Sequence, residues 1–457
     1  MNDLAIVICN YNKREFVLGC IKSVFQSDYL DFDVFVVDNA STDGSAEAIQ
    51  NEFGERLTLL INEMNTGGSG GFNRGMREVM ARNAYKYVIL LDNDTTLENN
   101  AIRELRSYMD QHPEVGICGA AIFQMNKPEI IQEMGALISL DEFTNKPLYR
   151  QLTADVLPLF VECDYVPFCA AIIRIDAIQK VGLMESRYFI YWDDMEFCWR
   201  VRNAGYKIRA ISSAIVYHNM SWSKPETSFI FYYFFRNKTN CFARHTNDFE
   251  FALLPEIITK RFYRSMICNQ DNSPVTSTYM YALDDALNGV MGKADDYKIV
   301  PLCTERKWHA LVKGKSNILI HYDPVFVKID VLLSQLRELC NAKLTVVTYG
   351  VDLSHFNSAD AIFVTEKTPD TQYDLEIIVC YHVLDLPFES ISFTEGKTLI
   401  YDNYENNIAD RDDFLVFQNY EKNYAVFRNM LYPFVKEKLR IIRERYHAEA
   451  FDHNPRL

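Results

Sequence analysis

Short apolar runs that end in polar turns alternate with segments of helical periodicity over the first hundred residues. Continuous apolar runs of this length are typical of buried strands, and apolar residues three or four positions apart are typical of helices. Strands are expected over residues 4–9, 33–38, 57–61 and 88–91, with helices over 15–25, from 45 and from 76. This alternation indicates a mostly parallel sheet with right-handed crossovers, so the predicted fold class is α/β.

The strand expected at 88–91 runs directly into Asp92 and Asp94, with Asn93 between them. Ligands of open α/β sheets bind just beyond the carboxyl ends of the strands. Alternate residues of an extended chain point the same way, so both carboxylates can face one ligand. Close carboxylates repel unless they are compensated, and a divalent cation that bridges phosphate oxygens does this. The alternative is a capping turn, which Asp and Asn also favour.

A glycine-rich segment follows the third expected strand. Residues 65–75 read Asn-Thr-Gly-Gly-Ser-Gly-Gly-Phe-Asn-Arg-Gly. Glycine lets a backbone approach a ligand closely, but the segment has neither the Walker lysine nor the dinucleotide spacing. The two interpretations are a ligand-binding loop and a flexible turn before the helix expected from Met76.

In their order and spacing, the turn 38–44, the segment 65–75 and the strand end 88–94 resemble glycosyltransferase family 2. The resemblance implies the GT-A fold, a domain for a nucleotide-diphospho-sugar. It implies that Asp38 hydrogen-bonds the nucleobase, that Asp92 meets the ribose or the metal, and that Asp94 ligates the divalent ion, Mn²⁺ or Mg²⁺. The other residues assigned to the nucleotide sugar are Asn10, Asn12, Asn39, Asn65, Gly68 and Asn93.

Adjacent carboxylates, Asp193 and Asp194, open a second informative segment over 188–200. One interpretation is structural, with Asp193 as an N-cap and Asp194 in the first turn near the positive helix end. The other is general-base catalysis, because a sugar hydroxyl must lose its proton as it attacks. The segment resembles the Glu-Asp motif of the same family, which makes Asp194 the base, with Asp replacing Glu at 193. The sequence Trp192-Asp-Asp is similar to the galactofuranosyltransferases of the family, and Trp192 is assigned to the acceptor side.

A histidine ends the strand expected at 214–218. A single histidine after a strand is more often structural. In the family that this chain resembles, however, a histidine at this distance completes the metal site, so His218 is the third expected ligand. Two carboxylates and an imidazole suit Mn²⁺ or Mg²⁺. Residues 219–227 are expected to form a mobile loop, with Trp222 as a candidate lid over the sugar.

The resemblance implies a GT-A domain over 1–240, and the pattern beyond it predicts a helical extension and linker over 241–300 and a smaller α/β domain over 301–457. Residues 293–297 are interpreted as linker. The aromatic run 229–235 predicts core packing or a patch on a membrane surface. The basic amphipathic helix expected at 432–450 has two interpretations, a membrane-surface element and a helix docked on its own domain.

Composition excludes some classes of protein. The 457 residues are 48% hydrophobic and 24% charged, as in globular proteins, and the formal net charge of −15 argues against general nucleic-acid binding. Eleven scattered cysteines without a Cys-x-x-Cys pair indicate reduced thiols. We find no signal peptide and no membrane span, and expect a cytoplasmic protein, with contact to the inner membrane face as an option.

The expected function is an inverting, metal-dependent glycosyltransferase that acts by single displacement. The first candidate donor is UDP-galactofuranose, followed by a rhamnose or other hexose donor. The acceptor is a hydroxyl of a polysaccharide or of a lipid-linked glycan, and a second copy of the chain is a further candidate partner. The alternatives are a non-catalytic sugar-nucleotide-binding scaffold and a nucleotidyltransferase, for which Lys13-Arg14 offers too little basic charge.

Overall fold

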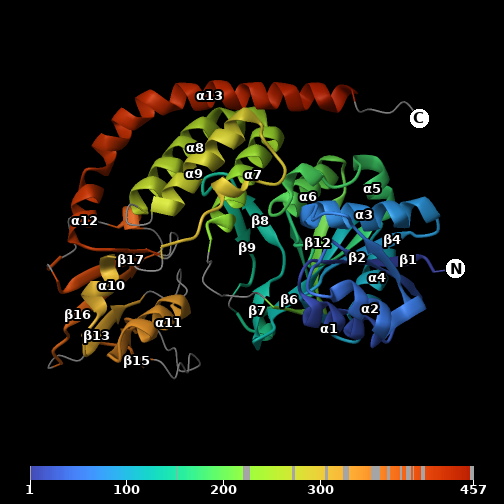
Figure 1. Ribbon diagram of the computed structural model, residues 1–457, viewed down its shortest axis with the longest axis horizontal. Coiled ribbons are helices and arrows are strands. Elements are labelled where there is room, and N and C mark those ends of the chain that lie inside the picture. The colour runs from blue at the N-terminus through green and yellow to red at the C-terminus, as the bar shows by residue number, and fades with distance from the viewer. Residues whose placement is uncertain are drawn as a thin grey trace.

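The described residues of the computed structural model form two large β-sheets, one two-stranded sheet and a layer of long helices (Figure 1). In the view of Figure 1 the larger sheet lies at the right, the smaller one at the lower left, and the helical layer lies above them. The structure describes residues 2–150, 152–219, 227–269, 273–303, 307–322, 329–350, 361–367, 371–380, 383–386, 393–394, 396–402 and 407–452.

Ten strands of the described chain form the larger sheet, in the order β10-β12-β6-β11-β4-β1-β2-β3, with β5 beside β12 and β7 beside β6. Six strands run in one direction (β1 to β4, β6 and β12) and four run against them. The predicted mostly parallel α/β sheet is therefore confirmed. The strands are β1 (Leu4–Asn10), β2 (Phe32–Asp38), β3 (Thr58–Ile61), β4 (Tyr87–Asp92), β5 (Thr95–Leu97), β6 (Val115–Gln124), β7 (Lys127–Glu133), β10 (Phe160–Cys163), β11 (Ala170–Arg174) and β12 (Lys207–His218).

Helices cover both faces of this sheet, which explains why its central strands are apolar almost throughout. Along β1, Leu4, Ile6 and Ile8 face one core with α1, α2 and α4, whereas Ala5 and Val7 face another with α3, α5 and α6. The bounds are α1 (Arg14–Phe25), α2 (Ser45–Phe53), α3 (Gly67–Arg82), α4 (Ala101–Gln111), α5 (Ile175–Val181) and α6 (Asp193–Asn203). A hairpin of β8 (Ala136–Ser139) and β9 (Thr144–Pro147) follows β7.

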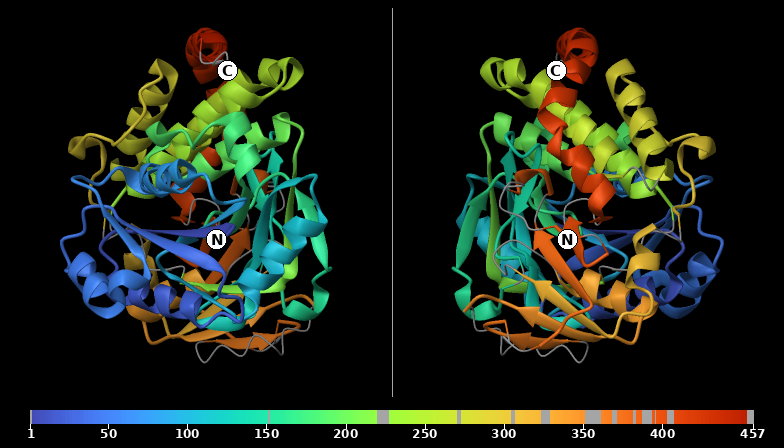
Figure 2. Two further views of the ribbon diagram at one scale, coloured as in Figure 1. Left: turned by 90° about the vertical axis from the view of Figure 1, so that its right-hand side faces the viewer. Right: turned by 90° about the vertical axis from the view of Figure 1, so that its left-hand side faces the viewer.

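The helical layer shares its core with the larger sheet. Tyr232, Leu254 and Leu283 belong to the same buried cluster as the sheet residues Val7 and Val88. The layer consists of α7 (Phe229–His245), α8 (Asp248–Cys268), α9 (Ser273–Asn288) and the long α13 (Tyr420–Asp452), which crosses the top of the molecule (Figures 1 and 2). The aromatic run at 229–235 contributes to this core.

Described strands between residues 317 and 409 form the smaller sheet, ordered β15-β14-β13-β16-β17-β18, in which β18 is antiparallel to β17 and the other neighbouring pairs in this order are parallel. One face packs on α10 and α11, and the other meets the end of α8 and the start of α13. The limits of the three predicted parts stay a prediction. The bounds are β13 (Asn317–His321), β14 (Lys343–Val347), β15 (Ile362–Val364), β16 (Leu375–Cys380), β17 (Thr398–Asp402), β18 (Asn407–Ala409), α10 (Lys307–Val312), α11 (Asp330–Leu339) and α12 (Arg411–Gln418).

The closing helix begins earlier than its sequence pattern predicts, and its later part packs outside the smaller α/β domain. Helix α13 begins at Tyr420, and Val435, Leu439 and Ile442 are buried in the core shared with the larger sheet. It is docked, as one interpretation has it: its start, with Tyr420 and Tyr424, packs on the smaller sheet, and from Val435 onward it packs on α7, α8 and α9. Arg443 pairs with Asp248 of α8 at 2.6 Å. Contact with a membrane surface stays a prediction. Within the described residues, no helix is long and apolar enough to cross a bilayer.

Candidate active site

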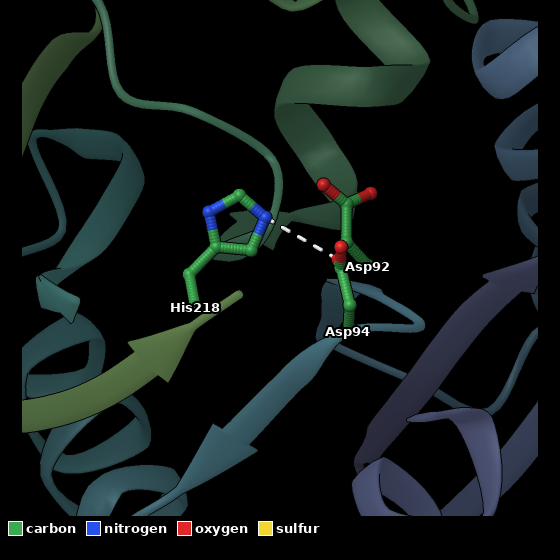
Figure 3. A group of neighbouring side chains, drawn as sticks. All are labelled: Asp92, Asp94 and His218. Carbon is green, nitrogen blue, oxygen red and sulfur yellow. Dashed lines mark ion pairs between the residues drawn. The ribbon is translucent and has the colours of Figure 1, made fainter. Parts of the chain in front are cut away.

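The three expected metal ligands come together at one edge of the larger sheet (Figure 3). Asp92 ends β4 and Asp94 follows two residues later, before β5. Strand β5 pairs with the end of β12, so that His218 lies opposite Thr95. The His218 Nε2 atom is 3.3 Å from Asp94 Oδ1, and one ligand atom from each of the three residues lies within 4.8 Å of the others. An antiparallel strand pair thus joins a histidine to carboxylates more than a hundred positions earlier in the chain.

The pKa values of all three side chains are shifted by burial and by their neighbours' charges. Burial, followed by the charge of Asp94, raises the pKa of Asp92 to about 6. For Asp94, burial is outweighed by the hydrogen bonds and charges of His218 and Lys13, so its pKa is lowered. Burial alone would lower the pKa of His218, but Asp94 and Asp92 outweigh it and the pKa is raised. A site of two carboxylates and one imidazole that needs positive charge fits a divalent cation.

A cavity of about 570 Å³ opens beside these carboxylates, and we call it the strand-end cavity. Two lysines from distant parts of the chain line this cavity. Lys13 Nζ pairs with Asp94 Oδ2 at 2.5 Å, and Lys293 lines the cavity from the segment after α9. The predicted nucleotide-sugar and metal residues that line it are Asn39, Asn65, Gly68, Asp92, Asn93, Asp94 and His218.

Three predicted nucleotide-sugar residues are not among the lining residues of this cavity. Asp38 is buried and uses both carboxylate oxygens internally, accepting from Asn10 Nδ2 at 3.0 Å and from the backbone N–H of Ser41 at 2.9 Å. Asn12 accepts from the backbone N–H of Thr42 at 2.7 Å. Asn10, Asn12 and Asp38 therefore tie the turn after β2 to the end of β1. Direct contact of these residues with a nucleobase stays a prediction.

The glycine-rich segment is not a loop, because α3 begins at Gly67, nine residues before Met76. Its glycines permit close packing. A Cβ atom on Gly71 would lie 2.2 Å from Cys9 Sγ, and one on Gly67 would lie 2.0 Å from the carbonyl oxygen of Phe189. Gly67 and Gly68 also line the strand-end cavity. The segment thus combines helix packing, which the sequence did not indicate, with a backbone wall of the cavity; its contact with a ligand stays a prediction.

A second cavity, of about 650 Å³, lies over the start of α6, and we call it the α6 cavity. Asp193, Asp194 and Trp192 line it, as do polar residues from β7 and the β8–β9 hairpin. Four residues line both cavities: Gly68, Asp92, Ile190 and His218. The carboxylates of α6 and the strand-end ligands therefore lie on one continuous cleft. Trp222 falls outside the described residues.

The first turn of α6 holds its carboxylates under strong repulsion. Burial, opposed by backbone hydrogen bonds but helped by the charges of Asp92 and Glu196, raises the pKa of Asp193 to about 6. Burial and then the charge of Asp193 raise the pKa of Asp194 well above the ordinary carboxylate range. The N-cap is Trp192 rather than Asp193, so the capping interpretation of Asp193 was wrong. A carboxylate with a raised pKa beside a cleft is suited to accept a proton.

The residues of the strand-end cavity that the sequence did not predict include its two lysines, Lys13 and Lys293. Lys13 was set aside because two basic residues made too weak a phosphate signature, and Lys293 was interpreted as part of a linker. The segment around Lys293 is instead held in place, since Ala294 N donates to Tyr233 Oη at 2.7 Å. Lys13 could have been recognised from its position, because it follows the polar residues that end the first strand. No sequence pattern marks Lys293, because its place at the cavity depends on the packing of the helical layer.

An α/β sheet whose strand-end carboxylates share a cleft with a second carboxylate pair can place a metal-bound ligand beside a proton acceptor. Residues 5–181 match the family model described as "Glycosyl transferase family 2". The protein is therefore a glycosyltransferase, and its residues 5–181 are similar to glycosyltransferase family 2.

Relatives with known names agree with this family. The chain is 23% identical over 272 residues to the "low-salt glycan biosynthesis hexosyltransferase Agl10" of Haloferax volcanii, covering 57% of this chain and 83% of that protein. It is 22% identical over 209 residues to the "galactofuranosyltransferase GlfT2" of Mycobacterium tuberculosis, covering 42% of this chain but only 32% of the relative. A crystal structure described as GalNAc-T7 with UDP, GalNAc and Mn²⁺ is similar with a TM-score of 0.44 and 15% identity, covering 57% of this chain and 51% of that one.

Proposed function

We propose that the protein is an inverting, metal-dependent glycosyltransferase that moves galactofuranose from a nucleotide-diphosphate donor to a hydroxyl of a polysaccharide or lipid-linked glycan. The observation that carries the proposal is the shared lining of the two cavities by Asp92 and His218. A donor in the strand-end cavity and an acceptor in the α6 cavity would meet there. The sequence Trp192-Asp-Asp and the galactofuranosyltransferase relative favour galactofuranose, and rhamnose or another hexose is the alternative donor sugar.

In the proposed reaction, the donor diphosphate lies beside Asp92, Asp94 and His218, and the acceptor hydroxyl lies beside Asp194. Asp194 takes the hydroxyl proton while the oxygen attacks the anomeric carbon from the side opposite the diphosphate. The bond to the diphosphate breaks in the same step, so the configuration inverts and no covalent intermediate forms. The chemistry that a divalent cation held by the three ligands supplies is Lewis-acid stabilisation of the leaving diphosphate.

The proton acceptor is tested by replacing Asp194. We expect Asp194→Asn to abolish sugar transfer, measured by mass spectrometry of the products from a panel of nucleotide sugars and glycan acceptors. The matched control is Asp176→Asn, because Asp176 occupies the same second position of a neighbouring helix, α5, but is exposed. Equal turnover by the wild type and Asp194→Asn would refute the assignment. Absence of transfer by the wild type with every donor would favour the scaffold alternative.

The metal ligands are tested separately, by binding. Asp94→Asn is expected to weaken Mn²⁺ binding in a titration followed by electron paramagnetic resonance, because a charged oxygen ligand is removed. Asp28→Asn, an exposed carboxylate paired with Arg103, is the control and should leave the titration unchanged. Identical titrations of Asp94→Asn and the wild type would contradict the assigned ligand set.

A further inference from the structure

The five residues before α6 adopt an unusual backbone. Phe189, Tyr191 and Trp192 all have positive φ angles, of 70°, 62° and 68°. Phe189 has ψ −57°, and Ile190 N donates to the carbonyl oxygen of Tyr188 at 2.9 Å, so these residues form a classic γ-turn, which is rare and strained. Residues other than glycine rarely adopt positive φ angles. Holding one such residue at a positive φ costs about 1–3 kcal/mol of folding free energy. The surrounding structure must therefore hold this loop in place.

One buried amide contacts the backbone of this loop at three carbonyl groups. Asn237, on α7, is fully buried, and its Nδ2 group lies at hydrogen-bond distance from the carbonyl oxygens of Tyr188, Ile190 and Tyr191, at 2.9, 2.7 and 2.9 Å. Its Oδ1 atom accepts from Arg236 Nε at 2.9 Å, which fixes the orientation of the amide. Three carbonyl groups of the loop backbone thus converge on a single side chain.

The neighbouring Arg236 connects the same loop to a wall of the strand-end cavity. Its guanidinium is fully buried, donates to the carbonyl oxygen of Tyr188 at 3.3 Å and donates to that of Gly292 at 2.8 Å. Gly292 directly precedes Lys293, a lining residue of the strand-end cavity. The pair on α7 therefore joins a wall of one cavity to the loop that begins the helix of the other.

We infer that Asn237 is a positioning residue for the reaction, acting through the loop 188–192 on the carboxylates of Asp193 and Asp194. The inference rests on the proposed function, in which Asp194 is the base. Trp192, the N-cap of α6, makes no side-chain capping bond, so the direction in which the helix starts is set by the loop. Without the amide, the carbonyl groups of Ile190 and Tyr191 lose this donor, that of Tyr188 keeps only Ile190 N and Arg236, and the strained residues relax toward ordinary angles. The carboxylates then leave the cleft position from which a proton can be taken.

The decisive variants are Asn237→Ala and Asn237→Asp, the second of which keeps the side-chain shape but removes the donating group. We expect kcat to fall about 100-fold, the loss that a displacement near 1 Å can cause. Affinity for UDP, measured by calorimetry, should fall by a smaller factor than kcat, because Asp92, Asp94 and His218 lie outside the loop and only Phe189 and Ile190 of the loop line the strand-end cavity. Thr239→Val is the matched control: Thr239 is equally buried on α7, but its hydroxyl bonds only to Phe235 of its own helix.

A readout independent of activity is hydrogen exchange of the peptide that spans 188–194. Exchange should accelerate in both Asn237 variants and not in Thr239→Val. Faster exchange with an unchanged kcat, or unchanged exchange, would overturn the inference. Loss of folding in both Asn237 variants while Thr239→Val folds would also overturn it, since Asn237 would then serve the whole fold. Activity of Asp194→Asn would instead contradict the proposed function, whatever the Asn237 variants do.

Discussion

Individual carboxylates in the cleft are kept close together at an electrostatic cost. Asp92, Asp193 and Asp194 all have pKa values raised by burial. Burial and like charge both favour the protonated form of a carboxylate. Such an arrangement is stable only if protons or a bound cation offset the charge, and these are the two events that the proposed reaction requires. The electrostatic cost of burying these carboxylates together therefore follows from the proposed reaction, which uses a proton acceptor and a bound cation.

The raised pKa of Asp194 predicts the pH dependence of transfer. Only the ionised carboxylate accepts a proton, so kcat should rise with pH through a pKa above the ordinary carboxylate range. Because Asp193 is a main cause of the shift after burial, Asp193→Asn should lower the pKa of Asp194 and move the acid limb to lower pH. The measurement is kcat against pH for both proteins. An acid limb that stays at the same pH would contradict this coupling.

Lys13 is predicted to compete with a metal ion for Asp94. Its ammonium group lies 2.5 Å from Asp94 Oδ2 but is 40% exposed. Partly exposed ion pairs are worth up to about 1 kcal/mol, so Lys13→Ala should tighten Mn²⁺ binding in the absence of nucleotide by no more than about fivefold. The same change should weaken UDP binding when Mn²⁺ is present, since a cation beside the diphosphate is lost.

The control for this prediction is Lys22→Ala, which removes a similar pair with Glu52 on α1 and α2. It should leave both titrations unchanged. Weaker Mn²⁺ binding in Lys13→Ala would show that the ammonium group supports the metal site and does not compete with it.

At this scale, the sequence predicted residues at strand ends and missed residues that reach the cleft by packing. Asp92, Asp94 and His218 each end or follow an apolar run, and that local pattern also fixes their place at the sheet edge. Asn237 lies within an aromatic helix, and its role depends on a loop nearly fifty positions earlier in the chain. No local pattern encodes such a pairing.

Among the elements, α3 shows how a composition signal was interpreted too narrowly. A run of glycines resembles a flexible turn, but the segment is helical from Gly67 because the helix must lie close to β1 and to the loop 188–192. The sequence also gave no indication of β6, β7 or the β8–β9 hairpin. Strand β6 is buried along its whole length in the larger sheet, so its apolar residues lack the alternation that marks a half-exposed strand.

The helix start at Gly67 can be tested by adding one methyl group. Gly67 has φ +76°, where an alanine costs about 1–2 kcal/mol. The added Cβ atom would also meet the backbone of Phe189, so the loop before α6 must move. We expect Gly67→Ala to lower the melting temperature and to reduce kcat. Gly19→Ala, in α1 where a Cβ atom meets nothing within 4 Å, should be neutral or stabilise the fold by about 0.5–1 kcal/mol. Full activity of Gly67→Ala would contradict the role of this contact.

In the molecule as a whole, the chain returns from its last third to complete the core of its first half. Helix α13 leaves the smaller sheet and packs along the helical layer (Figure 2). Its Tyr446 ring lies 5.1 Å from that of His245, which bonds Glu196 of α6 at 3.1 Å. The order of elements along the sequence suggests consecutive units, but a returning helix cannot be recognised from periodicity, because its apolar face fits any partner surface.

This arrangement predicts that a change near the C-terminus destabilises the catalytic part of the molecule. Leu439 is fully buried in the core that contains Val7, Val88 and Phe197. Truncation of such a side chain leaves a cavity and costs about 2–5 kcal/mol. We therefore expect Leu439→Ala to accelerate hydrogen exchange in α7 and α8 and to lower the temperature at which transfer activity is lost.

The matched control is Met430→Ala, on the same helix but 77% exposed, which should change stability by no more than about 0.5 kcal/mol. Hydrogen exchange in the smaller sheet shows whether α13 is coupled energetically to that sheet or to α7 and α8. If Leu439→Ala accelerated exchange only in β13 to β17 and left α7 and α8 protected, α13 would belong energetically to the smaller sheet. Its contacts with the helical layer would then contribute little to the stability of the catalytic half, and the carboxylates of α6 would depend only on the support they receive from α7.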